Sequence, residues 1–340
     1  KYKRSIKCIY IDPPYNTGQS EILYKNSYKH SSWLMLMKDR LRLGHNLLAI
    51  DGMQCTTIDD VEFHRLRELI ASVFGEQNLT GVAVIKNNPS GRSTVKGFSI
   101  AHEYGIFSSR SDEAMLGMLP RTKKQLMQYP EKDEIGRFQW RNFLRAGGAN
   151  DFRKARPRLH YPLIVKDNKV RLPKMEWDSQ KDRWDLLENP QEETVLWPSV
   201  NEIDYTWRLG VETLKTRLDD LRVRTLRNNR LVVEVKFRLD GRGVLAKTMW
   251  DEKEMNATAY GTTMLRNIIG ESQVFSFPKS IYAVEKSLRV CSVHENQNVL
   301  DYFAGSGTTG HAVINLNRED GEKRKFILVE MAEYFDTVLL

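Results

Sequence analysis

An acid, two prolines and a tyrosine follow the first strand-like run of the chain, residues 6–11. Asp12 and Pro13 each precede a proline, which biases both towards extended conformations, and Pro13 and Pro14 donate no backbone hydrogen bond. The loop therefore offers two acceptors, the Asp12 carboxylate and the Pro13 carbonyl, beside the ring of Tyr15. This arrangement suits a planar ring with an exocyclic amino group, whose nitrogen lone pair the acceptors would turn towards an electrophile. The alternative is a structural proline turn with a surface tyrosine.

A glycine-rich stretch near the other end of the chain is the second candidate site. Residues 305–310, GSGTTG, match the pattern G-x-G-x-x-G between a strand-like and a helix-like run, and Glu330 ends the next strand-like run. Glycines allow a tight turn, the first amides of the helix can face a ligand, and the acid can accept ribose hydroxyls. His311 stands where a P-loop requires lysine. The pattern predicts a nucleoside ligand and leaves nicotinamide, flavin and S-adenosylmethionine open.

Alternating strand-like and helix-like runs surround both candidate sites. This alternation predicts an α/β fold with a mostly parallel sheet covered by helices. Because ten residues follow Glu330, the other strands of the sheet must come from the N-terminal segment, in permuted order. Expected strands are residues 6–11, 47–52, 80–86, 102–109 and 324–330 with one that begins at 298, and expected helices are 32–48, 57–75 and 280–292 with one that ends at 317.

The permuted order predicts that the two candidate sites meet. Ligands of doubly wound sheets bind at the carboxyl ends of the strands, beside the topological switch point. Asp12 and the loop that begins at Gly305 both follow strand ends. We therefore expect both to line one crevice.

A basic block separates the two α/β segments. Between Arg121 and Lys174, 15 Lys and Arg face 5 Asp and Glu, an excess of ten that is larger than the net charge of +8 of the whole chain. Aromatic residues interleave with the basic ones, as in nucleic-acid-binding surfaces. We interpret residues 111–275 as an inserted α+β domain with a helix over 211–226. Its expected DNA contacts are Arg137, Arg141, Arg145, Arg153, Lys154, Arg156 and Arg158.

Other features restrict the class of protein. The three cysteines, Cys8, Cys55 and Cys291, lack CxxC spacing, so neither a disulfide framework nor a zinc site is expected, and no metal is predicted. No apolar run approaches the roughly 18 residues of a membrane span. The first residue is lysine, which indicates a fragment or a processed chain. Asp59-Asp60 is interpreted as a helix start and His102-Glu103 as a structural pair.

The order of the motifs resembles a known family. DPPYNTG early, a basic insert, and then FPK and LDYFAGSGTTGHAV late are similar to the β-class amino-methyltransferases of DNA. Segments such as WLMLMKDRLRL, AHEYGIF, RPRLHYPLIV and LWPSVNEIDYTWR look more narrowly like the modification subunit of type III restriction-modification systems. The resemblance covers nearly the whole chain, and family members extend beyond it at both ends.

This resemblance implies a Rossmann-like methyltransferase sheet, formed by residues 1–110 and 276–340, with residues 111–275 as the target-recognition domain. It implies transfer of a methyl group from S-adenosylmethionine to N6 of a flipped-out adenine in double-stranded DNA. Implied partners are a restriction subunit and a second copy of the chain, in the bacterial cytoplasm at the nucleoid. The implied catalytic residues are Asp12, Pro13, Pro14 and Tyr15. The implied cofactor residues are Asp12, Lys279, Asp301, Phe303, Gly305, Ser306, Gly307, Thr308 and Glu330.

Three alternatives remain open at the level of sequence. N4-cytosine methylation is the nearest, because cytosine also presents an amino group beside a ring nitrogen. The others are a DNA-recognition module that has lost catalysis and a methyltransferase for RNA or protein amides. Asp at position 12 favours adenine within the family, and the intact motifs and long basic insert disfavour the other two.

Overall fold

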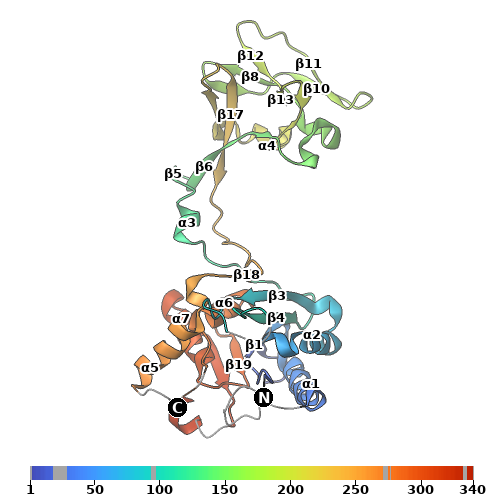
Figure 1. Cartoon of the computed structure of the whole chain (residues 1–340). Coiled ribbons are helices and arrows are strands. Elements are labelled where there is room, and N and C mark those ends of the chain that lie inside the picture. Colours follow the sequence, from blue (N-terminus) through green and yellow to red (C-terminus); the bar gives the residue numbers. More distant parts are fainter. Residues whose placement is uncertain are drawn as a thin grey trace. The chain divides into compact units, whose positions relative to one another are not determined.

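The computed structural model describes residues 2–17, 29–92, 97–270, 275, 277–331 and 335–339 (Figure 1). The chain forms two compact units: residues Lys1–Pro120 with Arg242–Leu340, called the sheet unit here, and Arg121–Gly241, called the inserted unit. The inserted unit is thus narrower than residues 111–275, because 111–120 and 242–275 group with the sheet unit. Gly18 of the DPPYNTG stretch lies outside the described residues.

A seven-stranded sheet forms the centre of the sheet unit, in the order β18-β3-β4-β2-β1-β19-β20. Within this sheet β4 pairs antiparallel with β2 and β3, and the other pairs are parallel. The mostly parallel sheet and its permuted order are confirmed, since β1 lies between β2 and β19. The strands are β1 (Ile6–Ile11), β2 (Leu48–Ile58), β3 (Leu79–Ile85), β4 (Glu103–Ser109), β18 (Met249–Trp250), β19 (Asn298–Asp301) and β20 (Lys325–Leu328).

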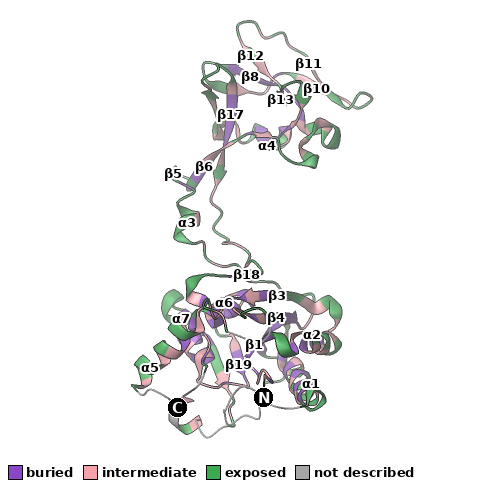
Figure 2. Cartoon of the chain, viewed as in Figure 1, coloured by how far each residue is buried: buried purple, intermediate pink, exposed green. Residues whose placement is uncertain are grey.

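Helices cover both faces of this sheet (Figure 1). α1 (His30–Leu47) and α2 (Asp60–Phe74) share one core with Ile9 and Ile11 of β1. α6 (Ile281–Val290) and α7 (Thr308–Asp320) share the opposite core with Cys8 and Tyr10. β1 is buried over its whole length (Figure 2), which explains its continuous apolar run, because strands covered on both faces do not alternate in polarity.

Shorter helices complete the sheet unit: η1 (Glu76–Asn78), η6 (Lys253–Met255), the π-helix η7 (Thr258–Thr262), α5 (Thr263–Ile269) and the π-helix η8 (Phe335–Leu339). Gly261 of η7 packs against the backbone of the FPK segment, where an added Cβ would lie 2.4 Å from the carbonyl oxygen of Pro278. In the described part of the chain, no helix is both long and apolar enough to cross a membrane.

Short strands dominate the inserted unit. Its larger sheets have the orders β16-β17-β6-β5 and β12-β8-β9, and its own core includes Phe143, Tyr161, Trp207 and Leu214. Its elements are α3 (Lys123–Leu126), β5 (Glu131–Lys132), β6 (Arg137–Asn142), β7 (Leu144–Arg145), η2 (Ala149–Asp151), η3 (Arg153–Ala155), η4 (Pro157–Leu159), β8 (Leu163–Lys166), β9 (Lys169–Arg171), β10 (Met175–Asp178), β11 (Arg183–Leu186), β12 (Thr194–Leu196), β13 (Ser199–Val200), β14 (Ile203–Asp204), β15 (Thr206–Trp207), α4 (Val211–Lys215), η5 (Leu218–Asp220), β16 (Leu221–Thr225) and β17 (Leu231–Arg238).

The helix expected over residues 211–226 is wrong beyond its first turn. α4 ends at Lys215, and Leu221–Thr225 forms β16, which pairs antiparallel with β17. The apolar residues of this segment still face the core of the inserted unit, but the last of them do so from a strand. Pairing with a strand that follows in the sequence overrides the local helical spacing.

Candidate functional site

The carboxyl ends of two neighbouring strands bring the two candidate motifs together. β1 and β19 pair in parallel with Ile9 opposite Leu300, so both strands end at the same edge of the sheet. Asp12 follows the first strand, and the glycine loop follows Asp301 at the end of the second. The charge of Asp12 is one of the influences that raise the pKa of Asp301. The expected proximity of the two motifs therefore agrees with the sheet order.

Hydrogen bonds from neighbouring elements fix the Asp-Pro-Pro-Tyr loop. The hydroxyl of Thr57, on β2, donates to Oδ1 of Asp12 over 2.6 Å. The indole Nε1 of Trp33, on α1, donates to the Pro14 carbonyl over 2.8 Å. Thr57 and Trp33 are fully buried. The loop is thus held by the core as well as by its own stiff prolines.

Lys279 joins this loop to a buried acid. Its Nζ lies 3.1 Å from Oδ1 of Asp12 and 2.7 Å from Oε2 of Glu103, and it donates to the hydroxyl of Tyr15. The Tyr15 hydroxyl in turn donates to Glu103 over 3.0 Å. The ammonium also lies 4.4 Å from the centre of the Tyr15 ring. The four side chains therefore form one connected polar cluster, which we call the Lys279 cluster.

Burial and nearby charges shift the pKa values of Lys279 and Tyr15 within this cluster. Burial acts to lower the pKa of Lys279, but the charges of Asp12 and Glu103 outweigh it, and the pKa is raised. Burial raises the pKa of Tyr15 well above its usual value, and the same two carboxylates raise it further. Lys279 therefore stays charged and Tyr15 stays protonated at neutral pH. The lysine positive charge compensates two acids that are mostly withdrawn from water.

Glu103 is a site residue that the sequence analysis missed. It is 1% exposed, and it also accepts a hydrogen bond from Nδ2 of Asn87 over 2.8 Å. The ring of the neighbouring His102 has another partner, since its Nε2 lies 3.0 Å from the hydroxyl of Tyr104. Glu103 thus belongs to the Lys279 cluster beside Asp12, which the interpretation of His102-Glu103 as a structural pair did not include. The signal for Glu103 is the alternation of side chains along β4. Glu103 lies on the same face of this strand as Gly105 and Phe107, and Phe107 belongs to the core that α6 covers.

The glycine loop has the geometry that its pattern predicts. Gly305 and Gly307 adopt left-handed φ values of 53° and 77°, and α7 begins directly after them. The amide of Gly305 donates to Oε2 of Glu330 over 2.8 Å. A Cβ at Gly305 would lie 3.0 Å from the ring of Phe275. The tight turn, the helix start and the acid beside them fit a nucleoside cofactor.

Asp301 and the residues around the loop support this fit. Burial raises the pKa of Asp301 to about 7, although hydrogen bonds from Thr309 Oγ1 (2.5 Å) and the Phe303 amide (3.0 Å) act in the opposite direction. The hydroxyls of Ser306 and Thr308 lie 3.1 Å apart at the start of α7. These side chains line the same turn. Lys279, which was also expected to contact the cofactor, lies beside Asp12 of the Asp-Pro-Pro-Tyr loop.

The acids at the start of α2 have structural partners. Asp59 occupies the N-cap position without a capping hydrogen bond, and its Oδ2 lies 2.6 Å from Nη2 of Arg92. Asp60 accepts a hydrogen bond from Tyr104 over 2.8 Å. In the part of the chain that the structure describes, no group of three or more His, Cys, Asp or Glu side chains could hold a metal ion.

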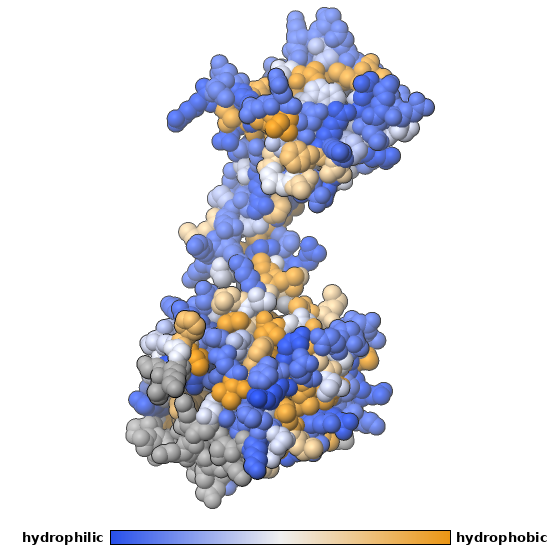
Figure 3. Space-filling model, turned by 45° about the vertical axis from the view of Figure 1, so that its right-hand side comes forward, coloured by the Kyte–Doolittle hydropathy of each residue, from blue (hydrophilic) through white to orange (hydrophobic). Residues whose placement is uncertain are grey.

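The seven basic residues expected to contact DNA all lie in the inserted unit, but their surroundings differ. Arg145 and Arg153 form ion pairs with Asp151 and Asp204. Arg141 lies 3.8 Å from the centre of the Phe237 ring, and Arg137 reaches the Tyr129 carbonyl. Lys154 is exposed in η3, and Arg156 and Arg158 border a hollow of 370 Å³. Hydrophilic side chains predominate on the face of this unit seen in Figure 3.

Comparison with known proteins identifies the family. The model of a family described as DNA methylase matches residues 6–339. The chain belongs to the DNA methylase family. Methyltransferases of this family use S-adenosylmethionine as methyl donor, in agreement with the nucleoside site that the glycine loop and Glu330 predict.

Individual relatives agree with this family. The type II methyltransferase M.KpnI of Klebsiella pneumoniae is 29% identical, over 96% of this chain and 75% of its own length. The Mod subunit of the type III enzyme EcoPI from Escherichia phage P1 is 27% identical, over 98% of this chain and 55% of its own length. The Mod subunit of the type III enzyme EcoP15I from Escherichia coli is 26% identical, over 98% of this chain and 56% of its own length. The similarity to type III modification subunits is confirmed, and the methylase chain spans about half the length of these two. Among solved structures, the cytosine-N4-specific PvuII DNA methyltransferase matches with a TM-score of 0.44 and 12% identity, over 97% of this chain and 76% of its own.

Proposed function

We propose that this methylase transfers a methyl group from S-adenosylmethionine to N6 of adenine in a short asymmetric site of double-stranded DNA. We further infer that it acts as the modification subunit of a type III restriction-modification system, on the nucleoid in the bacterial cytoplasm. The observation that carries the proposal is the meeting of Asp12 and the glycine loop at the ends of neighbouring parallel strands. The similarity to the Mod subunits supports the biological setting.

The Asp-Pro-Pro-Tyr loop would hold the target amino group. A base inside a duplex must be flipped out before it can react, at a cost of a few kcal/mol. In the described residues, the partners of Asp12 contact Oδ1, which leaves Oδ2 to accept from the amino group together with the Pro13 carbonyl. Tyr15 would stack on the base, and Pro14, held by Trp33, would keep the loop rigid. Alignment of this kind can remove roughly 7–11 kcal/mol of a barrier.

The glycine loop and its neighbours would hold the methyl donor, which supplies an electrophilic methyl group on a sulfonium. We assign its methionine part to Phe303, Gly305, Ser306, Gly307 and Thr308, with Asp301 beneath. Glu330, held beside the loop by the Gly305 amide, would accept the ribose hydroxyls. Lys279 would meet the donor carboxylate, and its contact with Asp12 would link the donor site to the base site.

The inserted unit would supply the DNA surface. Phosphate contacts from Lys and Arg dominate affinity for duplex DNA and make it fall with salt, with a slope near −0.9 per contact. Residues 121–174 carry the basic excess, and they lie within this unit. We infer that a restriction subunit and a second copy of the chain join the methylase in the full assembly.

N4-cytosine methylation is the second candidate function. Oδ2 of Asp12 and the Pro13 carbonyl would accept equally from the amino group of cytosine or adenine, because both present two hydrogens beside a ring nitrogen. Asp at position 12 favours adenine through the resemblance to the β class.

One experiment separates these possibilities. DNA from cells that express the full-length protein is read by single-molecule sequencing for modified bases. We expect N6-methyladenine on one strand of a short asymmetric site. N4-methylcytosine, or unmodified DNA with binding retained, would contradict the proposal.

A further inference from the structure

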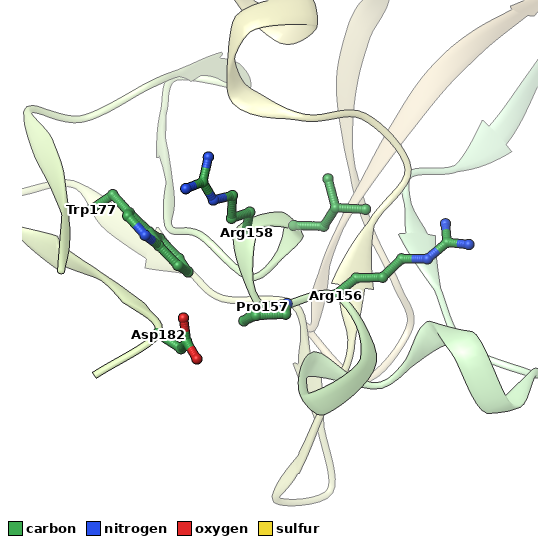
Figure 4. Close-up of a pocket in the computed structure, with 6 residues that line it drawn as sticks. Arg156, Pro157, Arg158, Trp177 and Asp182 are labelled. Atoms are coloured by element: carbon green, nitrogen blue, oxygen red, sulfur yellow. The ribbon is translucent and has the colours of Figure 1, made fainter. Parts of the chain in front are cut away.

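A hollow in the inserted unit is lined by two arginines, one aspartate and an indole. The hollow measures 370 Å³, and its lining is Arg156, Pro157, Arg158, Leu159, Trp177 and Asp182. The guanidinium of Arg158 lies over Trp177, 5.2 Å from the ring centre. Figure 4 shows Arg158 and Asp182 on opposite sides of Trp177, and it shows the guanidinium of Arg156 directed away from that ring.

The charges of Arg158 and Asp182 are not neutralised by ion pairs with other described residues. Among the residues that the structure describes, neither Arg158 nor Asp182 has an ion-pair partner, and the two side chains do not pair with each other. Neighbouring arginines differ, because Arg153 pairs with Asp204 and Arg183 with Asp185. A cation and an anion that line one hollow without neutralising each other are suited to bind a ligand that carries both acceptors and a donor.

The elements behind these side chains hold them in place. The indole Nε1 of Trp184, on β11, donates to the Arg158 carbonyl over 3.1 Å and so ties η4 to the β10–β11 hairpin. Trp177 and Trp184 are opposite in that hairpin and meet edge to face, with ring centres 5.5 Å apart. The turn that presents Asp182 is fixed by Asp178, whose Oδ1 accepts from the amides of Gln180 and Lys181.

We propose that Arg158 and Asp182 read one G·C base pair in the major groove of the recognition site. Guanine presents the acceptors O6 and N7 there, and its partner cytosine presents an adjacent N4 amino donor. The Arg158 guanidinium would donate to the guanine, and the Asp182 carboxylate would accept from the cytosine. Trp177 keeps the guanidinium oriented through a cation–π contact. This inference rests on the proposed function, in which the inserted unit binds DNA.

A contact with the phosphate backbone explains the hollow less well. A carboxylate at Asp182 would repel a phosphate that approached Arg158, whereas it is an acceptor that cytosine requires. Arg156, whose guanidinium points away from Trp177 (Figure 4), would contact the phosphate backbone instead. The two arginines of one short segment are thus expected to differ in what they recognise.

The test measures base preference and not affinity alone. The recognition site is first found from the modified bases in cells, and the full-length protein is then titrated with duplexes in which each G·C pair is replaced in turn by A·T. The wild-type protein is expected to lose binding at each pair that it reads, by on the order of 10- to 100-fold. In both Arg158→Ala and Asp182→Ala, replacing the G·C pair that these residues read should no longer weaken binding. This pair should be the same for the two variants, and replacing the other G·C pairs should still weaken binding. Arg158→Lys should behave like Arg158→Ala, since lysine lacks the fork of donors.

Control variants separate base reading from general effects. Arg156→Ala should weaken binding to every duplex alike and lower the salt slope by about one. Arg183→Ala removes an arginine that pairs with Asp185 and should leave every preference unchanged. A recognition site without G·C pairs, preferences retained in both hollow variants, or equal weakening on all duplexes would overturn the inference. If the wild-type protein leaves DNA unmodified, the proposed function fails instead.

Discussion

Asp12 is the residue on which the proposed chemistry depends most directly. Its Oδ1 is engaged by Thr57 and Lys279, so the carboxylate is oriented before a base arrives. A preoriented acceptor at an amino nitrogen assists attack only while the base is held, so its loss should affect the chemical step and leave DNA affinity intact. This separation makes substitution at Asp12 informative.

Asp12→Ala should reduce methylation at least 100-fold, in the range typical for positioned acid–base groups. DNA binding, measured by fluorescence anisotropy, should stay within about twofold of the wild type, because the proposed DNA surface lies in the inserted unit. Asp39→Ala, an exposed acid on α1, is the matched control and should methylate normally. Unimpaired turnover in Asp12→Ala would refute the role of the loop.

Asp301 gives the fold a pH dependence of its own. Burial raises its pKa to about 7, above the usual value of about 4. At a pH between these two values, the Asp301 carboxyl is therefore protonated in the folded protein and ionised in the unfolded chain. Stability from this group is present at pH 4 and is lost as the pH rises towards 7.

Asp301→Asn should remove this pH dependence, since asparagine does not titrate. Between pH 5 and 7 the unfolding free energy of the wild type should fall relative to the variant, by up to about 1.4 kcal/mol per pH unit. Calorimetric unfolding of both proteins at pH 5, 6, 7 and 8 measures the difference. Parallel stability curves would show that Asp301 is already ionised in this range.

At the scale of elements, the π-helix η7 packs against the backbone of the segment that carries Lys279. Gly261 allows η7 to approach the FPK backbone, where a Cβ would lie 2.4 Å from the Pro278 carbonyl oxygen and 2.7 Å from that of Lys279. Real Cβ atoms do not approach backbone oxygens so closely, so one of the two segments must move. π-helical turns often occur at functional sites, and this one abuts the segment that carries the cluster lysine.

Gly261→Ala should therefore displace Lys279 from Asp12 and Glu103. We expect an unfolding free energy lower by about 1–3 kcal/mol, as for overpacked cores, and methylation reduced by about tenfold or more. Gly81→Ala is the control, because a Cβ at Gly81, in β3, would meet no atom within 4 Å. Loss of stability with normal methylation would show that Lys279 does not depend on this contact.

The elements also show what local patterns could and could not predict. β1 and α7 follow from uninterrupted local signals, an apolar run and a glycine loop before a helix. Glu103 was missed because its partners Asn87, Tyr15 and Lys279 are distant in the sequence. The helix expected over 211–226 failed because a strand that follows it, β17, captures residues 221–225. The two-residue strands of the inserted unit are too short for alternation to be recognised.

At the scale of the whole chain, two crossings connect the inserted unit to the sheet unit. Leu119 and Val244 pair as an antiparallel bridge within the sheet unit, with both backbone hydrogen bonds at 2.8–2.9 Å. Beyond that bridge, Arg121 and Asp240 form an ion pair of 2.8 Å at the ends of the inserted unit. The two ends of the insertion therefore lie beside each other. Each unit also has its own core, which is the condition for independent folding.

Removal of the inserted unit should separate cofactor binding from DNA recognition. A variant that joins Leu119 to Val244 through Asn-Gly replaces residues 120–243 with a two-residue hairpin turn, which suits a hydrogen-bonded antiparallel pair. It should unfold cooperatively and bind S-adenosylmethionine in calorimetric titration, because the glycine loop, Glu330 and Lys279 are all retained. It should lose DNA affinity by at least tenfold and show no site-specific methylation. The excised residues 121–241 should in turn fold and bind DNA with a strong salt dependence. If the shortened chain kept the DNA affinity of the wild type, the recognition surface would lie in the sheet unit instead, and the basic block would be an ordinary solvated face.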